Sequence, residues 1–120
     1  MVNEIRGLVS HHGGLCAEDS VAADYIRRGH SIVRRRWRGQ SGEIDLIARG
    51  ACGLVFIEVK AARSHGRAAQ RISRRQIERI YCAASEYVAG EPDGQSTDMR
   101  FDVALMNRVG VIDIIENAYM

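Results

Sequence analysis

The sequence predicts a single α/β domain in which a mixed β-sheet is flanked by helices, in the order αβββαββ. A chain of 120 residues has the length of one domain that buries roughly 60% to 70% of its unfolded surface. Apolar residues recur with helical spacing in one stretch near the start and in another beyond the middle. β-rich runs lie between these stretches and at the C-terminal end. Within the domain of residues 1–120, residues 1–14 are expected to form a loose segment.

The first predicted helix covers residues 15–28, and a basic strand and a β-hairpin follow it. Gly29 supplies a stop for the helix, residues 30–38 form the strand, and residues 39–42 form a turn. Two apolar, β-branched runs within residues 42–60 predict the hairpin. The helical stripe consists of Leu15, Val21, Ala22, Tyr25 and Ile26.

The second predicted helix begins after Ser73 and ends at Gly90. Ser73 and Gln76 have the spacing of a capping box, and a helical stripe follows. Residues 61–69, which precede this helix, are expected to form a loop. The stripe consists of Ile77, Ile80, Tyr81, Ala84 and Val88.

Two further β-rich runs, residues 100–106 and 111–115, close the chain after a polar loop at residues 91–98. The order strand, crossover helix, strand predicts that the first of these runs lies parallel to the second hairpin strand. The sheet is therefore expected to be mixed.

The composition excludes several classes of protein. The chain has no apolar run of 18 residues and no signal-peptide pattern at its start, so a cytoplasmic protein without a membrane segment is expected. Cys16, Cys52 and Cys82 are odd in number and form no CxxC pair, which argues against a disulfide framework and a zinc site. We therefore expect them to be small buried hydrophobic residues.

The charge is distributed unevenly along the chain. The net charge is +2, yet residues 27–79 carry thirteen Arg and one Lys against four acidic residues, a net charge of +10. A solvated charged face is one interpretation, and a footprint for a polyanion is the other. The scarcity of nearby acids favours the footprint. Trp37 could stack on an exposed base or anchor its strand to the core, which is the commoner role. The candidate nucleic-acid contacts are Arg34, Arg35, Arg36, Trp37, Arg38, Arg63, Arg67, Arg74 and Arg75.

The hairpin carries carboxylates where a stable hairpin would avoid them. If residues 50–53 form its loop, position i pairs with position 103 minus i, which places Asp45 opposite Glu58 and Glu43 opposite Lys60. At an effective dielectric constant near 20, the repulsion between two opposed carboxylates is on the order of 3 kcal/mol. The other face is apolar and is predicted to be core: Ile44, Leu46, Ala48, Val55, Ile57 and Val59.

Three arrangements could offset this repulsion. One carboxyl group could be protonated, Lys60 could lie between the two, or a divalent cation could bridge them. Two converging carboxylates make a partial oxygen cage for Mg²⁺, which keeps several waters and accepts phosphate oxygens. Glu18 is a third candidate ligand, because it lies in the apolar stripe of the first helix, where a carboxylate needs a partner.

Lys60 is the single lysine among seventeen basic residues, two positions after Glu58. An ammonium group can press on a phosphate oxygen or on a water beside a metal, where the planar fork of Arg does not replace it. A cross-strand ion pair with Glu43, at a position where Lys occurs by chance, is the alternative.

These residues resemble a known pattern. D-x(12)-E-x-K across adjacent strands, with a Glu on a preceding helix, is similar to the PD-(D/E)XK nuclease superfamily. Three stretches of the chain resemble the YraN family, small bacterial proteins regarded as predicted endonucleases and distantly related to archaeal Holliday junction resolvases. The first stretch begins with "AEDSVAADYIRRGHSIVRRRWRGQSGEIDL" and continues through the hairpin. The other two are "RISRRQIERIYCAASEYV" and "RFDVALM", and together the three cover nearly the whole chain.

The resemblance implies a restriction-endonuclease-like core and a Mg²⁺ or Mn²⁺ site. It implies that Glu18, Asp45 and Glu58 are metal ligands and that Lys60 is the catalytic lysine, with Asp45 and Glu58 also counted as catalytic. Glu43, Gln76 and Asp102 could support the site, although Asp102 could instead pair with Arg100. The chain departs from the family at Ala62, where many relatives have Arg, and at Gln76, where Lys is often expected.

The expected function is therefore that of a Mg²⁺-dependent endonuclease that hydrolyses phosphodiester bonds in DNA, in branched or single-stranded structures. The alternative is an inactive nucleic-acid-binding module that acts in a repair or recombination complex. Resolvase analogy suggests a homodimer.

Overall fold

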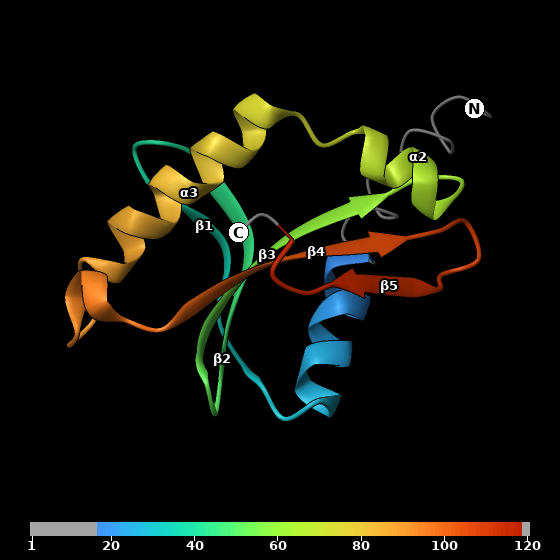
Figure 1. Cartoon of the computed structure of the whole chain (residues 1–120). Coiled ribbons are helices and arrows are strands. Elements are labelled where there is room, and N and C mark those ends of the chain that lie inside the picture. The colour runs from blue at the N-terminus through green and yellow to red at the C-terminus, as the bar shows by residue number, and fades with distance from the viewer. Residues whose placement is uncertain (1–16, 119–120) are drawn as a thin grey trace, which may run out of the picture.

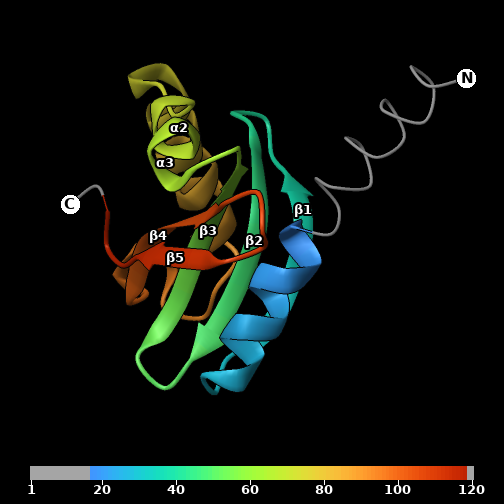
Figure 2. The same cartoon turned by 90° about the vertical axis from the view of Figure 1, so that its right-hand side faces the viewer.

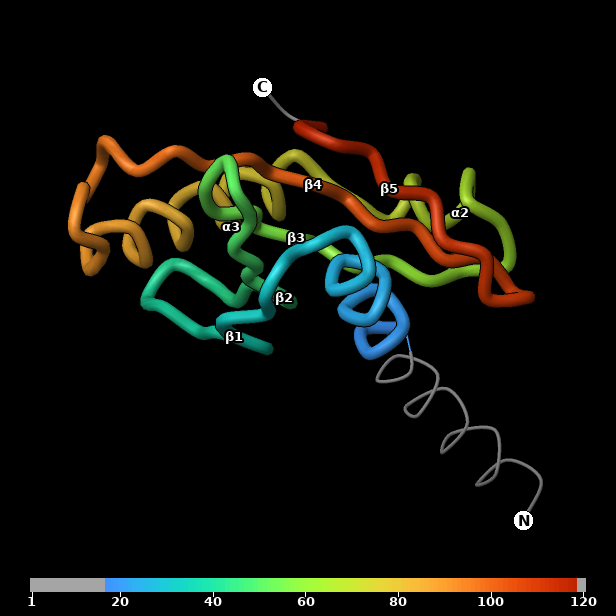
Figure 3. The backbone as a smooth tube through the Cα atoms, turned by 90° about the horizontal axis from the view of Figure 1, so that it is seen from below, coloured from blue at the N-terminus to red at the C-terminus, as the bar shows by residue number. Residues whose placement is uncertain are grey.

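A computed structural model describes residues 17–118 of the chain, which form a five-stranded sheet in the order β1-β2-β3-β4-β5 (Figure 1). Strands β3 and β4 are parallel, and the other neighbours are antiparallel. The view from below shows β3 and β4 running side by side across the molecule (Figure 3). The predicted mixed α/β sheet is confirmed. The strands are β1 (Ser31–Arg38), β2 (Glu43–Gly50), β3 (Gly53–Ala61), β4 (Met99–Met106) and β5 (Ile112–Ile115).

Helices cover both faces of this sheet (Figure 2). One face carries the helix of residues 17–27, called helix 17–27 below. The other carries α2 (His65–Gln70) and α3 (Arg74–Val88), and a 3₁₀ helix, η1 (Gly94–Ser96), follows α3. Figure 2 shows α2 and α3 on one side of the strands and the blue N-terminal helix on the other. Two buried clusters, one under α3 and one under helix 17–27, form the core.

The two longer helices agree with the prediction, with small differences. Helix 17–27 lies within the predicted residues 15–28, of which Leu15 and Cys16 fall outside the described residues. Ile26 was expected in its apolar stripe, but 54% of this residue is exposed. Ser73 caps α3, since its hydroxyl oxygen accepts a hydrogen bond from the Gln76 backbone N–H at 3.1 Å.

Helix α2 contradicts the prediction of a loop at residues 61–69. The Ser64 hydroxyl accepts a hydrogen bond from the Arg67 backbone N–H and so caps this six-residue helix. Ala68 is its one buried residue. A helix that buries one alanine leaves no apolar stripe in the sequence, which is why the pattern failed to indicate it.

The predicted hairpin register is confirmed from Gly50 opposite Gly53 to Leu46 opposite Ile57. The turn itself is two residues long, because Gly50 and Gly53 already pair.

The predicted core face of the hairpin is confirmed, since Ile44, Leu46, Ala48, Val55 and Ile57 are buried. The prediction that the opposite face is acidic was wrong near the turn. Both faces are buried near the turn, because α3 covers Ile47, Leu54 and Phe56 while helix 17–27 covers the opposite side. Ile44 also packs in the α3 cluster, not beside Leu46. The β1–β2 ladder has its register shift between Ile32 and Arg34, and Arg36 further along β1 has a left-handed φ of 49°.

Two of the cysteines also differ from the expectation. Cys52 and Cys82 are exposed and not buried, since Cys52 lies in the hairpin turn and Cys82 on the outer face of α3. Cys16 lies outside the described residues. In residues 17–118 the structure contains no helix with the length and apolar character needed to cross a membrane.

Candidate metal and nucleic-acid site

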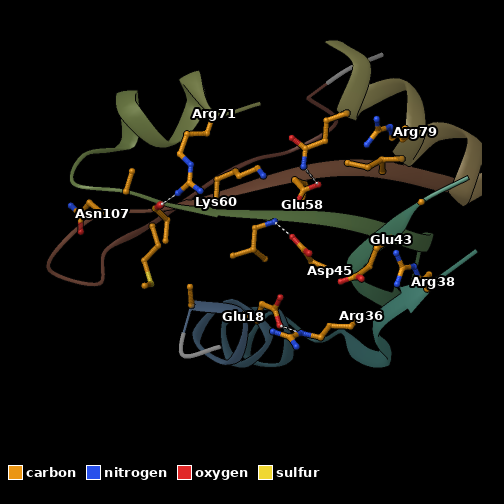
Figure 4. Close-up of a pocket in the computed structure, with 18 of the residues that line it drawn as sticks. Glu18, Arg36, Arg38, Glu43, Asp45, Glu58, Lys60, Arg71, Arg79 and Asn107 are labelled. Carbon is orange, nitrogen blue, oxygen red and sulfur yellow. Dashed lines mark hydrogen bonds and ion pairs between the residues drawn. The ribbon is translucent and has the colours of Figure 1, made fainter. Parts of the chain in front are cut away.

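A cleft of about 1080 Å³ opens beside the middle of the sheet, where β2 and β3 separate (Figure 4). Helix 17–27 and β1 border it on one side, and α3 and the turn after β4 border it on the other. The predicted carboxylates and the predicted lysine all line this cleft: Glu18, Glu43, Asp45, Glu58 and Lys60.

The separation of the strands follows from where their ladder ends. Backbone pairing stops at Leu46 and Ile57, one position before the predicted opposition of Asp45 and Glu58. There, the backbone N–H of Val59 donates to Asp45 Oδ2 at 2.8 Å. A side-chain carboxylate thus takes the place of a backbone acceptor, and this hydrogen bond fixes the direction of Asp45 at the mouth of the split.

Glu58 is nearly inaccessible, with 5% of the residue exposed. Burial, together with a hydrogen bond to Asp45 and the charge of Asp45, raises the pKa of Glu58 to about 9, although Lys60 acts in the opposite direction. Gln76 Nε2 donates to Glu58 Oε2 at 3.2 Å. The two carboxyl groups therefore converge, and a proton on Glu58 offsets their repulsion in the absence of a cation.

Glu18 approaches the same site from helix 17–27. Its Oε2 lies 3.1 Å from Arg36 Nε. Burial raises the pKa of Glu18, the hydrogen bond from Arg36 lowers it, and the charges of Asp45 and Glu43 raise it further. The charge of Asp45 thus acts on Glu18, while Arg36 occupies one oxygen of the Glu18 carboxylate.

The donor set fits a cation that retains water. Among residues 17–118, no three His, Cys, Asp or Glu side chains are arranged to hold a metal ion by themselves. Mg²⁺ commonly uses one or two carboxylates and keeps several waters. The convergence of Asp45 and Glu58, whose side chains are hydrogen-bonded to each other, meets that requirement.

Three other predicted site residues lie in different surroundings. Gln76 reaches the site through Glu58, so its side chain does not complete the capping box. Asp102 is fully buried and does not line the cleft, because it accepts hydrogen bonds from Tyr25 and Arg100. Trp37 packs edge-on against Tyr87, with 5.3 Å between ring centroids, which agrees with the alternative that it anchors its strand.

The predicted arginines divide into three groups. Arg36 and Arg38 line the cleft. Arg63 and Arg67 line a neighbouring cavity of about 470 Å³. The others are exposed and line neither space, and Arg35 pairs with Asp19 at 2.8 Å; they are Arg34, Arg35, Arg74 and Arg75.

The sequence interpretation missed four polar residues of the cleft. Arg71 and Arg79 lie in the basic segment already singled out, but nothing in that segment distinguished them from their neighbours. Asn107 and Arg108 follow β4, and the parallel register brings them near Lys60 because Ala61 pairs with Met106. The predicted parallel pairing of these two strands is therefore the signal that could have identified Asn107 and Arg108.

Comparison with known proteins places the chain among its relatives. A sequence profile of the uncharacterised protein family UPF0102 matches residues 17–106. The chain belongs to this family, which is the YraN family. A UPF0102 protein of Cereibacter sphaeroides (strain KD131 / KCTC 12085) is 58% identical over 115 residues, which cover 96% of this chain and 98% of that protein.

Two other members of the family are similar over comparable lengths. A UPF0102 protein of Ruegeria pomeroyi is 54% identical over 114 residues, 95% of this chain and 93% of the relative. One of Roseobacter denitrificans is 50% identical over 112 residues, 93% of this chain and 87% of the relative. The names of these relatives state a family and no activity, so the function must be argued from the cleft.

Proposed function

We propose that this protein is a metal-dependent nuclease that hydrolyses phosphodiester bonds in DNA. The observation that carries the proposal is the convergence of Asp45 and the buried Glu58 beside Lys60, in a cleft with arginines at its edges. Keeping two carboxyl groups together in a buried position costs stability. A structural role does not explain that cost, because among residues 17–118 Gln76 is the one side chain that donates a hydrogen bond to Glu58.

Asp45 and Glu58 would hold Mg²⁺ or Mn²⁺, with Glu18 placed to act through water. Such a cation, when bound, lowers the pKa of a water molecule and neutralises charge on a phosphate. The Val59 N–H holds one carboxylate in position and Gln76 holds the other. Positioning by fixed neighbours of this kind keeps ligands in one geometry.

Lys60 contributes a positive charge to the same space. It lies two residues after Glu58 on β3, and both residues line the cleft. From there, its ammonium group donates to a phosphate oxygen or to the attacking water and offsets developing negative charge. Its lone occurrence in an arginine-rich chain agrees with this role.

Binding without hydrolysis is the second candidate function. The observation in its favour is that Arg36 holds Glu18, so that two carboxylates, and not three, converge in the described part of the chain. In that case the arginines would bind DNA in a repair or recombination complex, and the acidic cluster would have lost its reaction.

An assay of four DNA forms separates the two functions. Single-stranded, duplex, flapped and four-way DNA are each incubated with the protein in Mg²⁺ or Mn²⁺. We expect cleavage of at least one form, with Asp45→Asn and Lys60→Met reducing its rate about 100-fold or more. Asp113→Asn is the matched control, since Asp113 is exposed on β5 and does not line the cleft. If none of the four DNA forms is cleaved in Mg²⁺ or Mn²⁺, and both variants bind DNA as wild type does, the binding module is the better account.

A further inference from the structure

The cleft continues into the second cavity. The two spaces share Ala62 and Arg71 in their linings. The second cavity is bordered by the start and end of α2, and its polar side chains are Arg63, Arg67, Gln70 and Arg71. None of the acidic residues that the structure describes lines this cavity, in contrast to the cleft.

The arginines of this second cavity have no ionic partners in the described part of the chain. Within residues 17–118, no carboxylate lies within ion-pair distance of Arg63, Arg67 or Arg71. Several arginines elsewhere do have carboxylate partners: Arg27 and Arg28 with Asp24, Arg35 with Asp19, Arg49 with Glu91, and Arg100 with Asp102. Three neighbouring positive charges repel each other unless an anion lies between them.

The walls of this cavity are fixed in place. Arg71 Nη1 donates to the carbonyl oxygen of Ala61 at 2.8 Å, so one nitrogen of its guanidinium is anchored at the end of β3. The Arg108 backbone N–H donates to the carbonyl oxygen of Arg63 at 3.3 Å. A hydrogen bond of 2.9 Å between His65 Nε2 and the carbonyl oxygen of Val111 ties α2 to the segment before β5. The arginines are therefore presented from a braced surface.

We infer that the second cavity binds the phosphate backbone of the substrate strand beyond the phosphate that is cut. Arg38 and Arg79 lie at one end of the cleft and Arg71 and Asn107 at the other, with the carboxylates between them (Figure 4). A strand that crosses the carboxylates and leaves past Arg71 reaches Arg63 and Arg67 next. This inference rests on the proposed function and narrows its substrate.

The narrowed substrate is a polynucleotide that is cut at an internal phosphodiester. A dinucleotide would fill the acidic centre and leave the second cavity empty, so it would gain nothing from Arg63 and Arg67. A longer strand neutralises both arginines and releases their counterions. Length of the strand on the Arg71 side should therefore increase affinity.

The test compares two double variants with equal changes in charge. Arg63→Gln/Arg67→Gln removes the second cavity's free arginines, and Arg27→Gln/Arg49→Gln removes two surface arginines that line neither cavity. Binding of a fluorescein-labelled single-stranded 20-mer is measured by anisotropy at several salt concentrations in EDTA, where no cleavage occurs. Matching thermal unfolding curves verify that both variants are folded.

We expect the cavity variant to bind the 20-mer about 10-fold or more weakly than wild type, and the surface variant to bind within about 2-fold. The slope of log K against log salt is negative, and its magnitude should decrease by about 1.4 in the cavity variant, since each of two lost phosphate contacts contributes about 0.7. Equal binding by the two variants would overturn the inference. Because the readout is binding, a wild-type protein that cleaves nothing would refute the proposed function and leave this result standing.

Discussion

Two buried carboxylates on neighbouring strands have opposite surroundings. Asp102 on β4 accepts four hydrogen bonds, from Tyr25 Oη at 2.7 Å, from Arg100 Nε at 2.8 Å and Nη2 at 2.9 Å, and from the Asn117 backbone N–H at 2.9 Å. Glu58 on β3 has Gln76 as a donor and faces the carboxylate of Asp45. The fold supplies everything that Asp102 needs as an anion, and it leaves Glu58 short of positive charge.

The contrast shows how to separate structural from functional acids in this domain. A carboxylate that stabilises a fold is surrounded by donors that compensate for its lost hydration. A carboxylate that awaits a ligand stays costly until the ligand arrives. Removing the charge should therefore change stability in opposite directions at the two positions.

The largest expected effect is at Asp102. Asp102→Asn places an NH₂ group among four donors and leaves Arg100 without its buried partner, so we expect a loss of about 3 to 5 kcal/mol in the free energy of unfolding. Urea denaturation measures this value. Asp113→Asn, which makes the same chemical change on the exposed face of β5, should stay within about 0.5 kcal/mol of wild type. Equal effects at both positions would remove the distinction.

The second effect has the opposite sign and depends on pH. Burial and Asp45 raise the pKa of Glu58 from its ordinary value of 4.5 to about 9, so between these values the folded state binds the extra proton. Stability therefore falls as pH rises through this window, by about 1 kcal/mol for each pH unit. Glu58→Gln removes this slope, and we expect it to be about 2 to 3 kcal/mol more stable than wild type at pH 7 in EDTA.

Thermal and urea unfolding from pH 5 to pH 8.5 tests this expectation. If the stability of wild type in EDTA does not change with pH and Glu58→Gln is less stable than wild type, Glu58 stabilises the fold as Asp102 does, and the expectation is wrong. Saturating Mg²⁺ should raise the stability of wild type and leave Glu58→Gln nearly unchanged, because the cation binds the folded state through this carboxylate.

The smallest effect concerns one donor of Asp102. Tyr25→Phe removes a buried hydroxyl whose pKa is raised far above its usual range by burial and by the hydrogen bond to Asp102. Three donors remain, so we expect a loss of about 1 to 2 kcal/mol. A double-mutant cycle with Asp102→Asn should give a coupling energy of similar size, and purely additive losses would show that the two residues act independently.

The hairpin register could be predicted from the sequence because its signals are local. β-branched runs of fixed length flank a short turn, and Gly53 has a φ of 122° that favours glycine. The end of the ladder could not be predicted in the same way. It depends on the side chain of Asp45, which accepts a hydrogen bond from the Val59 N–H, and the alternation of residues along the strand does not determine this contact.

The acidic residues of the site could be predicted individually from the sequence, whereas the arginines could be predicted only as a basic segment. Opposed carboxylates are a local conflict that a pattern reveals, whereas an arginine counts as free only when the whole fold shows that no acid reaches it. Asp102 illustrates the same limit, since its partner Tyr25 lies 77 positions away. The sequence did not predict helix α2, because a short, exposed helix has no periodic pattern of apolar residues.

The hydrogen bond between the Val59 N–H and Asp45 also makes the backbone a spectroscopic reporter of the site. An amide proton that points at a carboxylate oxygen has a chemical shift that follows the charge on that oxygen. In an NMR titration with Mg²⁺, the Val59 amide signal should therefore move early and saturate with the binding curve, while amides of the Asp102 network stay in place. One resonance would give the affinity of the cation without any substrate or any reaction.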